Sequence, residues 1–175
     1  MKLMICGRKR AGKDTACDWL RAHYGGNKDF FAKPLYDALY AALDVLDMEH
    51  EKIRPILESL GKHRRRDYPD YFIHALFERL NLTPAYSNRF ISDGRFQNEI
   101  DSAKDYGYKV VLVLADDDIR RTRLDAGDII SNDAVSENGF DYSDHSQFDA
   151  VLTNNGTLED YYIQVQKMYE KFRDG

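Results

Sequence analysis

The chain has 175 residues, of which 43% are apolar and 31% are charged, and its formal net charge is −5. This length and composition are typical of one globular α/β domain with its own hydrophobic core. The net negative charge argues against a protein whose main partner is a nucleic-acid backbone. No apolar run is long enough to cross a membrane, so we expect a cytoplasmic protein without a membrane partner, whose two cysteines, Cys6 and Cys17, stay reduced.

A glycine-containing loop follows the first predicted strand. The apolar run Lys2–Cys6 predicts a buried strand, and residues 12–24 predict a helix that stops at Gly25-Gly26. Between them lies Gly7-Arg8-Lys9-Arg10-Ala11-Gly12-Lys13-Asp14-Thr15, a GxxxxGK pattern. Such loops cradle a polyphosphate with backbone N–H groups and the helix dipole, while the lysine reaches the β- and γ-phosphates. The predicted phosphate-binding residues are Gly7, Arg10, Ala11, Gly12, Lys13, Asp14 and Thr15.

The residue after the loop lysine departs from the commonest form of this pattern. Position 14 is Asp instead of Ser or Thr, and the hydroxyl comes one residue later, at Thr15. The usual direct bond from that hydroxyl to Mg²⁺ is therefore in doubt. We expect Thr15 to bind a phosphate oxygen or a metal-bound water, and Asp14 to face the side on which a phosphate acceptor binds.

The next segment predicts a short strand and then several helices. The strand is expected over 29–32, and helices are expected over 34–46, over 49–60 with Gly61 as its stop, and over 68–80. In α/β proteins with a phosphate loop, a helical insertion at this place can hold the acceptor. We therefore expect the region of about 34–82 to be an acceptor-binding insertion.

A basic cluster, Lys62-His63-Arg64-Arg65-Arg66, directly follows Gly61. Guanidinium groups bind phosphate oxygens through two parallel hydrogen bonds, so Arg64 or Arg66 is expected to contact an acceptor phosphate. The nearby aromatic side chains leave two interpretations open. Tyr71 either stacks on a base or packs in the core, because its helical spacing fits both.

The next strand, over 89–92, ends at Asp93 and is followed by a predicted helix over 95–106. A carboxylate at a strand end that faces a phosphate loop can hold a metal-bound water, or orient and deprotonate an acceptor oxygen. The other interpretation of Asp93 is a helix N-cap, a role that Asp favours. Arg95 opens the predicted helix, where it could clamp a phosphate.

Residues 109–115 are almost entirely Val and Leu and predict a central parallel strand buried on both faces. A short basic helix over 118–124 follows and carries Arg120, Arg121 and Arg123. Phosphoryl transfer needs cations around the developing negative charge, and Arg120 and Arg123 lie three residues apart on one helix face. With the polar stretch that follows, residues 117–147 are expected to form a lid over the phosphate donor.

The last predicted elements are a strand over 148–153 and a helix capped by Thr157 and Asp160. Alternation of strands and helices along the whole chain predicts one three-layer α/β domain over 1–175, with a central five-stranded parallel sheet and helices on both faces. Ligands of such sheets bind at the carboxyl ends of the strands. The phosphate loop, Asp93 and the arginine helix all lie there.

With these residues assembled, the chain resembles the deoxynucleoside monophosphate kinases of bacteriophages and bacteria. The resemblance covers most of the chain and lies in GRKRAGKDT at 7–15, FFAKPL at 30–35, LESLGKHRRR at 57–66, FISDGRFQNE at 90–99, SENGF at 136–140 and FDAVLTNNGTLED at 148–160. The stretch SDGRFQNE is the more diagnostic, whereas the glycine loop is common to a whole class of phosphate-binding proteins.

The resemblance implies the P-loop nucleotide kinase fold and transfer of the ATP γ-phosphate to a deoxynucleoside 5′-monophosphate, with Mg²⁺ and in the host cytoplasm if the chain is phage-encoded. It assigns Lys13 and Thr15 to the ATP site and Asp93 and Arg95 to the acceptor side, and it aligns Ser136-Glu137 with a recurring pair. The expected catalytic residues are Lys13, Asp93, Arg95, Arg120 and Arg123. The expected substrate-binding residues are Arg64, Arg66, Tyr71, Asp93, Arg95 and Glu137, and Thr15 and Asp93 are the expected metal contacts, directly or through water.

Three other functions stay open. The acceptor could be a hydroxymethylated pyrimidine in phage DNA, although the acidic net charge counts against it. A dephospho-coenzyme A kinase shares the closing Asn-x-Gly-Thr-Leu stretch, but SDGRF argues against it. A nucleotide-binding module without transfer activity is the third, and Asp93 and the arginine helix argue against that. The sequence leaves open whether the chain forms a homodimer.

Overall fold

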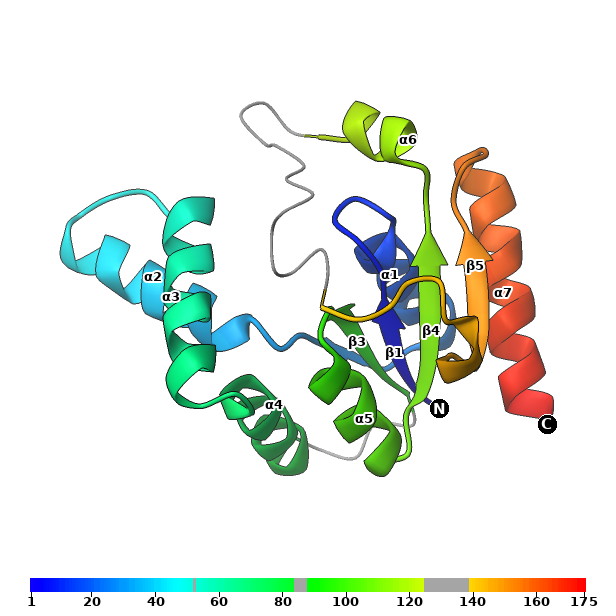
Figure 1. Ribbon diagram of the computed structural model, residues 1–175, viewed down its shortest axis with the longest axis horizontal. Helices are drawn as coiled ribbons and strands as arrows, with labels where there is room; N and C mark the ends of the chain where they lie inside the picture. Colours follow the sequence, from blue (N-terminus) through cyan, green and yellow to red (C-terminus); the bar gives the residue numbers. More distant parts are fainter. Residues whose placement is uncertain (52, 84–87, 125–138) are drawn as a thin grey trace. The chain divides into compact units, whose positions relative to one another are not determined.

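The computed structural model describes residues 1–51, 53–83, 88–124 and 139–175, which Figure 1 draws in colour. The chain divides into two compact units. The first comprises Met1–Lys28 and Ala85–Gly175 and contains most of the sheet, and the second comprises Asp29–Pro84 and is helical. The second unit is thus an insertion in the sequence of the first.

The sheet has five strands in the order β2-β3-β1-β4-β5. They are β1 (Lys2–Cys6), β2 (Asn27–Asp29), β3 (Arg89–Gly94), β4 (Lys109–Leu114) and β5 (Ala150–Thr153). The β1–β3, β1–β4 and β4–β5 pairs are parallel. The central strand β1 is fully buried from Leu3 to Cys6, because both of its faces are covered. The predicted α/β fold with a five-stranded parallel sheet is therefore confirmed.

Helices cover both faces of this sheet. The helices α1 (Lys13–Tyr24) and α7 (Leu158–Asp174) contact each other and lie on one face, where Leu20 and Val165 join a core cluster with Ile5 and Val113. The helix α5 (Gln97–Asp105) packs against β4, on the opposite side of the sheet from α1 in Figure 1. The short helix α6 (Asp117–Thr122) follows the carboxyl end of β4. None of the described helices is both long and apolar enough to span a membrane.

The second strand lies two residues earlier than predicted. Its backbone begins directly after Gly25-Gly26, where the Asn27 N–H donates to the Asn88 carbonyl at 3.0 Å. The apolar run that suggested a strand instead turns into the next helix, because the Lys33 N–H donates back to the Phe30 carbonyl. Phe31 is buried in this turn, so its apolar character reflects burial without strand pairing.

The inserted unit contains three helices, α2 (Lys33–Val45), α3 (Arg54–Asp67) and α4 (Tyr71–Leu82). Leu39, Leu43 and Leu57 form a small core cluster between α2 and α3. The prediction of a helix over 49–60 that stops at Gly61 is wrong. The helix begins later, with Pro55 in its first turn, and continues through Gly61 to Asp67.

Gly61 has a packing role instead of a stop role. It is buried, and a Cβ atom at this position would lie 3.2 Å from Cδ1 of Leu35 on α2. Glycine therefore allows α3 to approach α2 closely. As a consequence, the basic cluster 62–66 lies on the last turns of a helix and not in the loop that the sequence suggested.

The remaining elements differ from prediction mainly at their ends. The strand β3 includes Asp93 and Gly94, and α5 begins at Gln97 instead of Arg95. The strand β5 is preceded by a 3₁₀ turn over His145–Gln147. The predicted cap of the last helix is confirmed, since the Thr157 hydroxyl accepts the Asp160 N–H at 3.1 Å and donates to the Asp160 carboxylate at 2.6 Å.

Candidate active site

The loop between β1 and α1 has a backbone that needs glycine at both glycine positions of the GxxxxGK pattern. Gly7 has φ +145° and Gly12 has φ +112°, values that side chains rarely adopt. A Cβ atom at Gly7 would lie 2.4 Å from the Val113 carbonyl oxygen, and one at Gly12 would lie 2.3 Å from Nδ2 of Asn154. Arg10 is also left-handed, with φ 65°. The loop is therefore packed tightly against β4 and against the turn after β5.

Lys13 is the first residue of α1 and is only 5% exposed. Its Nζ donates to the carbonyl oxygens of Gly7 at 2.8 Å and Arg8 at 2.9 Å. The ammonium group is thus held inside the curl of the loop, at the start of a 12-residue helix whose dipole also favours an anion there. A buried cation beside glycine-shaped backbone is the arrangement that a polyphosphate requires.

Asp14 stands where the commonest form of this loop has a metal-binding hydroxyl, and it forms an ion pair with a lysine. Nζ of Lys28, at the end of the sheet unit's first segment, lies 2.8 Å from Asp14 and 3.1 Å from Asp18. Partial desolvation raises the pKa of the Asp14 carboxyl, but Lys28 and a hydrogen bond from Ser92 outweigh it, so this pKa lies below its ordinary value. Thr15, one residue on, is half-buried in the first turn of α1.

Asp93 lies at the carboxyl end of β3, half-buried and one strand away from the loop. Burial raises the pKa of the Cys6 thiol, Glu99 raises it further, Lys13 lowers it, and Asp93 raises it again. Lys13 follows the loop after β1 and Asp93 lies at the end of β3, and these two strands are adjacent and parallel. The structure brings these two predicted residues to the same end of the sheet.

The N-cap interpretation of Asp93 is wrong. The helix α5 starts four residues later, and the segment that leads into it is held by Glu99, whose carboxylate accepts from the backbone N–H of Arg95 at 2.9 Å and of Phe96 at 3.1 Å. Glu99 is 2% exposed. Sequence reasoning missed this role, although a glutamate in the first turn of a helix is a known capping signal. Arg95 thus precedes the helix, with its backbone fixed by Glu99.

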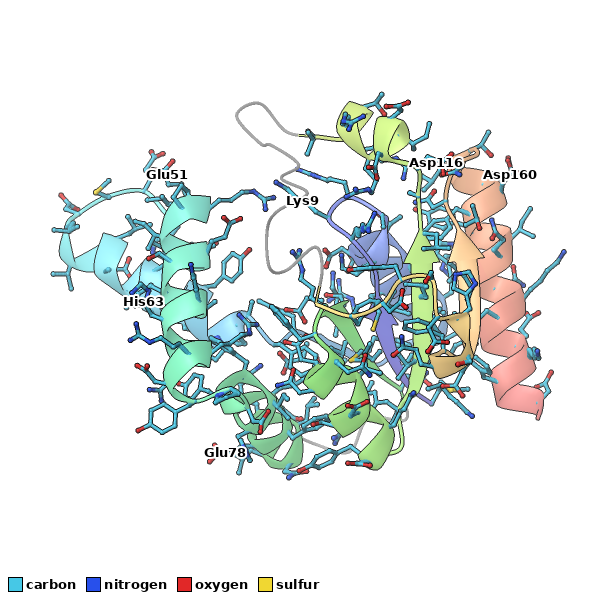
Figure 2. All side chains as sticks on the ribbon, in the orientation of Figure 1. Lys9, Glu51, His63, Glu78, Asp116 and Asp160 are labelled. Atoms are coloured by element: carbon cyan, nitrogen blue, oxygen red, sulfur yellow. The ribbon has the colours of Figure 1, made fainter. Side chains whose placement is uncertain are left out.

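Arg120 is 1% exposed, so it is a buried part of the loop's support. Its Nη1 donates to the carbonyl oxygen of Lys9 at 3.1 Å, and its Nη2 donates to Asp117 at 2.7 Å. The hydrogen bond from Arg120 holds the pKa of the Asp117 carboxyl below its ordinary value. Figure 2 labels Lys9 on the loop and Asp116 just before α6. In contrast, Arg121 is exposed and pairs with Asp118 at 2.6 Å.

Arg123, directly after α6, joins the turn between β5 and α7. Its Nη2 donates to the backbone oxygen of Asn154 at 2.9 Å and to the side-chain oxygen at 3.3 Å. Asn154 in turn donates from Nδ2 to the Ala11 carbonyl at 2.8 Å, and the Tyr161 hydroxyl donates to the Gly12 carbonyl at 3.1 Å. The sequence predicts a turn at Asn154-Asn155-Gly156 and a core position for Tyr161, and neither pattern indicates their contacts with the loop.

Another arginine of the loop contacts the polypeptide that precedes β5. The Arg8 guanidinium lies 4.6 Å from the ring centre of Tyr142 and 4.0 Å from Asp117. Arg10, the remaining predicted phosphate contact with a charged side chain, is half-buried. Arg8 and Arg10 thus belong to the loop, Arg120 donates to its Lys9 carbonyl, and Arg123 is joined to it through Asn154. The sheet unit therefore concentrates positive charge beside Lys13.

Three of the predicted substrate-binding residues, Arg64, Arg66 and Tyr71, lie in the inserted unit, whereas Asp93 and Arg95 belong to the sheet unit. The Arg64 guanidinium lies over two rings, 4.5 Å from the centre of Tyr68 and 4.0 Å from the centre of Tyr71. Arg66 is exposed and pairs with Asp67 at 2.8 Å. Glu137, with its neighbour Ser136, lies outside the described residues.

A metal site is not formed by protein ligands alone in the described ranges, where no group of three or more His, Cys, Asp and Glu side chains could hold an ion. The metal contacts predicted for Thr15 and Asp93 stay predictions. Phosphate oxygens would supply the other ligands of a Mg²⁺ ion bound with a nucleotide, as is usual for this ion.

No protein-family model matches the chain. Over 131 residues the chain is 32% identical to the uncharacterized protein ORF77 of Ictalurid herpesvirus 1 (strain Auburn). This match covers 71% of the chain and 53% of ORF77, so the chain spans about half the length of that relative. Over 193 residues it is 25% identical to a protein of Acanthamoeba polyphaga mimivirus named "Putative deoxynucleotide monophosphate kinase", with 92% of each chain covered.

The solved structure of TT1252 from Thermus thermophilus is similar across almost the whole length. The two share a TM-score of 0.61 over 97% of this chain and 96% of TT1252, at 18% sequence identity. This likeness shows the fold. The viral relative supports a kinase-like function, and the chain, on its motifs, its fold and this distant relative, resembles the deoxynucleoside monophosphate kinases.

Proposed function

We propose that the protein transfers the γ-phosphate of ATP to the 5′-phosphate of a deoxynucleoside monophosphate, which gives ADP and a deoxynucleoside diphosphate. The observation that carries this proposal is the buried Lys13 ammonium, which donates hydrogen bonds to backbone carbonyl oxygens of the glycine-containing loop. The name of the mimivirus relative supports the choice of acceptor. The sequence motifs at Asp93-Gly94-Arg95 support it as well.

The loop fits a nucleoside triphosphate. Gly7, Ala11, Gly12, Lys13 and Thr15 would hold the phosphates with backbone N–H groups, the lysine ammonium and a hydroxyl, and Arg10 would add a second positive charge. When bound, Mg²⁺ would neutralise charge on the β- and γ-phosphates, with Thr15 and Asp93 as the residues to hold it directly or through water. Asp14, which Lys28 and Ser92 hold, would face the acceptor side.

The chemistry asks for positioning and charge more than for a nucleophilic side chain. An oxygen of the acceptor phosphate forms the new bond to the γ-phosphorus while the bond from that phosphorus to the β,γ-bridging oxygen breaks. Lys13 and Arg123 would stabilise negative charge around the transferred group. Asp93 would orient the acceptor oxygen, and Arg95 would hold the acceptor phosphate. Arg120 acts in this proposal through Lys9, whose backbone it holds.

The unit Asp29–Pro84 is proposed to bind the acceptor. Arg64 is the better candidate for a phosphate contact there, because two tyrosine rings hold its guanidinium in one place. Tyr71 then supports Arg64 instead of stacking on a base. Arg66 pairs with Asp67 and is the weaker candidate. Glu137 is proposed to contact the base or the sugar.

The experiment is a substrate screen. The purified protein is incubated with ATP, Mg²⁺ and each deoxynucleoside and ribonucleoside monophosphate in turn, and diphosphate formation is followed. Turnover of at least one deoxy substrate, abolished in Lys13→Ala and retained in the exposed control Lys171→Ala, is the expected result. Absence of turnover with every monophosphate, while ATP still binds, would overturn the proposal and direct the screen to hydroxymethylated DNA and dephospho-coenzyme A.

A further inference from the structure

We propose that Asn154 is a positioning residue, which fixes the phosphate loop and Arg123 relative to each other so that Arg123 can bind the nucleotide. The inference rests on the proposed binding of ATP at the loop and adds a residue from the opposite end of the chain. Asn154 belongs to the turn after β5, and the loop residue that it contacts is 143 positions away in the sequence.

Asn154 is 6% exposed, and its polar atoms are engaged by three different segments. Its side-chain Nδ2 donates to the Ala11 carbonyl of the loop at 2.8 Å. Its side-chain and backbone oxygens both accept from Nη2 of Arg123. Its backbone N–H donates to the Leu114 carbonyl at the end of β4, at 2.8 Å. One side chain therefore joins the loop to the arginine beyond α6.

The amide group is the functional group that this position requires. The loop side offers a carbonyl oxygen, which needs a donor, and the arginine side offers an N–H, which needs an acceptor. A carboxylate at position 154 would place a negative oxygen against the Ala11 carbonyl. A serine would be too short to reach both partners. Asparagine satisfies both with one planar group.

The backbone of the loop also packs directly against the Asn154 side chain. A Cβ atom on Gly12 would lie 2.3 Å from Nδ2 of Asn154 and 3.2 Å from Cε1 of Tyr161, so the second loop glycine is seated against these two side chains. Tyr161 is 1% exposed and donates to the Gly12 carbonyl. Asn154 and Tyr161 together fix the backbone from Ala11 to Gly12, immediately before Lys13.

The guanidinium of Arg123, which Asn154 holds, is only partly satisfied by hydrogen bonds among the described residues. Nη2 of Arg123 is taken up by Asn154, whereas its Nη1 is buried and has no hydrogen-bond partner among the described residues. A buried charged donor without an acceptor costs free energy, which an incoming acceptor atom recovers. The geometry therefore presents Nη1 to an acceptor atom of a nucleotide bound at the loop, at a place that Asn154 determines.

The neighbouring Asn155 supplies a matched control. It is exposed, and its side-chain oxygen accepts the Asp116 N–H at 2.9 Å, so it ties the same turn to the start of α6 without touching the loop. A substitution at 155 removes a hydrogen bond of the same turn and leaves the contacts of Asn154 with Ala11 and Arg123 in place.

The test measures ATP binding by calorimetry without any acceptor, and then KM for ATP and kcat where turnover exists. We expect Asn154→Ala and Asn154→Asp each to weaken ATP binding by about tenfold or more, as for loss of a buried hydrogen bond to a charged group. KM for ATP should rise more than kcat falls. Asn155→Ala should stay within about twofold of the unsubstituted protein, as surface substitutions usually do.

A double-substitution cycle tests the link to Arg123. If Asn154 acts through Arg123, the combined Asn154→Ala and Arg123→Gln protein should lose less affinity than the product of the two single losses. A loss equal to that product would overturn the inference, as would unchanged ATP affinity in folded Asn154→Ala. If the Asn154 variants fail to fold, Arg123→Gln alone must weaken ATP binding for the inference to stand.

These outcomes separate the inference from the proposed function. If no monophosphate is phosphorylated but the pattern of ATP affinities holds, the positioning role of Asn154 stands and the acceptor assignment fails. If the unsubstituted protein binds no nucleotide, the positioning role fails together with the assignment of the loop.

Discussion

In the sheet unit, Lys13, Arg120 and Arg123 are half-buried or buried, and each donates to backbone carbonyl oxygens of the loop or of the turn after β5. In the inserted unit, Arg64 instead lies on the rings of Tyr68 and Tyr71, and Arg66 is exposed beside Asp67. The first set is fixed by groups that cannot move without moving the fold. The second set is held by side chains alone.

This difference matches two kinds of ligand. A triphosphate presents the same charged groups every time, so a preorganised array of buried donors stabilises it without reorganisation. In our proposal the acceptor phosphate instead meets arginines that other side chains hold, Arg64 on two rings and Arg66 beside Asp67, so substitutions there disturb fewer backbone contacts. We therefore expect substitutions in the sheet unit to have larger and less selective effects than those in the inserted unit.

The largest effect is expected at Lys13. Because its ammonium is the buried cation at the centre of the loop, Lys13→Met should lower kcat/KM by about a thousandfold, the upper range for removal of one preorganised donor. Steady-state kinetics with ATP and a deoxynucleoside monophosphate provides the measurement. Arg66→Gln in the other unit is the matched loss of one charge, and an equal loss there would remove the contrast between the units.

The next effect concerns two closely packed glycines, one in each unit. Gly12→Ala places a Cβ atom 2.3 Å from Asn154 at a φ of +112°, so it should lower the free energy of unfolding by about 1–3 kcal/mol. Gly61→Ala meets only flexible side-chain ends at 3.2 Å, within a helix that favours alanine. Its effect should stay within about 1 kcal/mol. Urea unfolding of both variants tests this, and a larger loss for Gly61→Ala would contradict the assigned packing.

A smaller and more selective effect is expected at Arg64. Replacing it by Gln removes a held guanidinium that we assign to the acceptor phosphate, so KM for the monophosphate should rise about tenfold, within the usual value of one charged hydrogen bond. KM for ATP should not change. Arg66→Gln should have the weaker effect on the acceptor. The reverse order of the two variants would assign the acceptor phosphate to Arg66.

The smallest effect is the pH dependence of the Asp14–Lys28 pair. The pKa of Asp14 is lowered in the fold, so its contribution to stability is present above the pKa of the unfolded chain and is lost as the pH falls through the folded value. Lys28, with a raised pKa, keeps its contribution until strongly alkaline pH. The pair should add about 1 kcal/mol or less, because Asp14 is largely exposed.

Thermal unfolding between about pH 3 and pH 7, a range that spans the ordinary pKa of Asp, would detect this contribution. Lys28→Met should lose stability at pH 7 and should lose less on acidification than the unsubstituted protein. Lys33→Met is a suitable control, since Lys33 forms a similar pair with Asp37 in the inserted unit, at 2.7 Å. An identical acid response of the unsubstituted protein and Lys28→Met would exclude the coupling between Lys28 and Asp14.

The parts of the fold that could be predicted from the sequence are those with local causes. The GxxxxGK pattern needs only seven consecutive residues, Gly7 to Lys13, and the start of the last helix is predicted by its own cap at Thr157 and Asp160. The buried strands β1 and β4 follow from short apolar runs. In each case the residues that determine the element are its neighbours in the chain.

The parts that sequence reasoning missed depend on residues far away in the chain. Gly61 suggested a helix end, but Leu35 on another helix decides its role. Asn154 suggested a turn, but its partner is Ala11. Arg120 was expected on a closing segment, and the structure buries it under the loop through Lys9. The catalytic role of Arg120 stays a prediction.

The hydrogen bond from the Asn27 N–H to the Asn88 carbonyl has a consequence for how such a protein can evolve. Asn27 lies just before the inserted unit and Asn88 just after it, and the two are neighbours in the sheet unit. The insertion therefore leaves and re-enters at adjacent points, as a surface loop does, and its length places little constraint on the sheet. On the function that we propose, exchange of this segment for another would change the acceptor and leave the proposed ATP-binding unit unaltered.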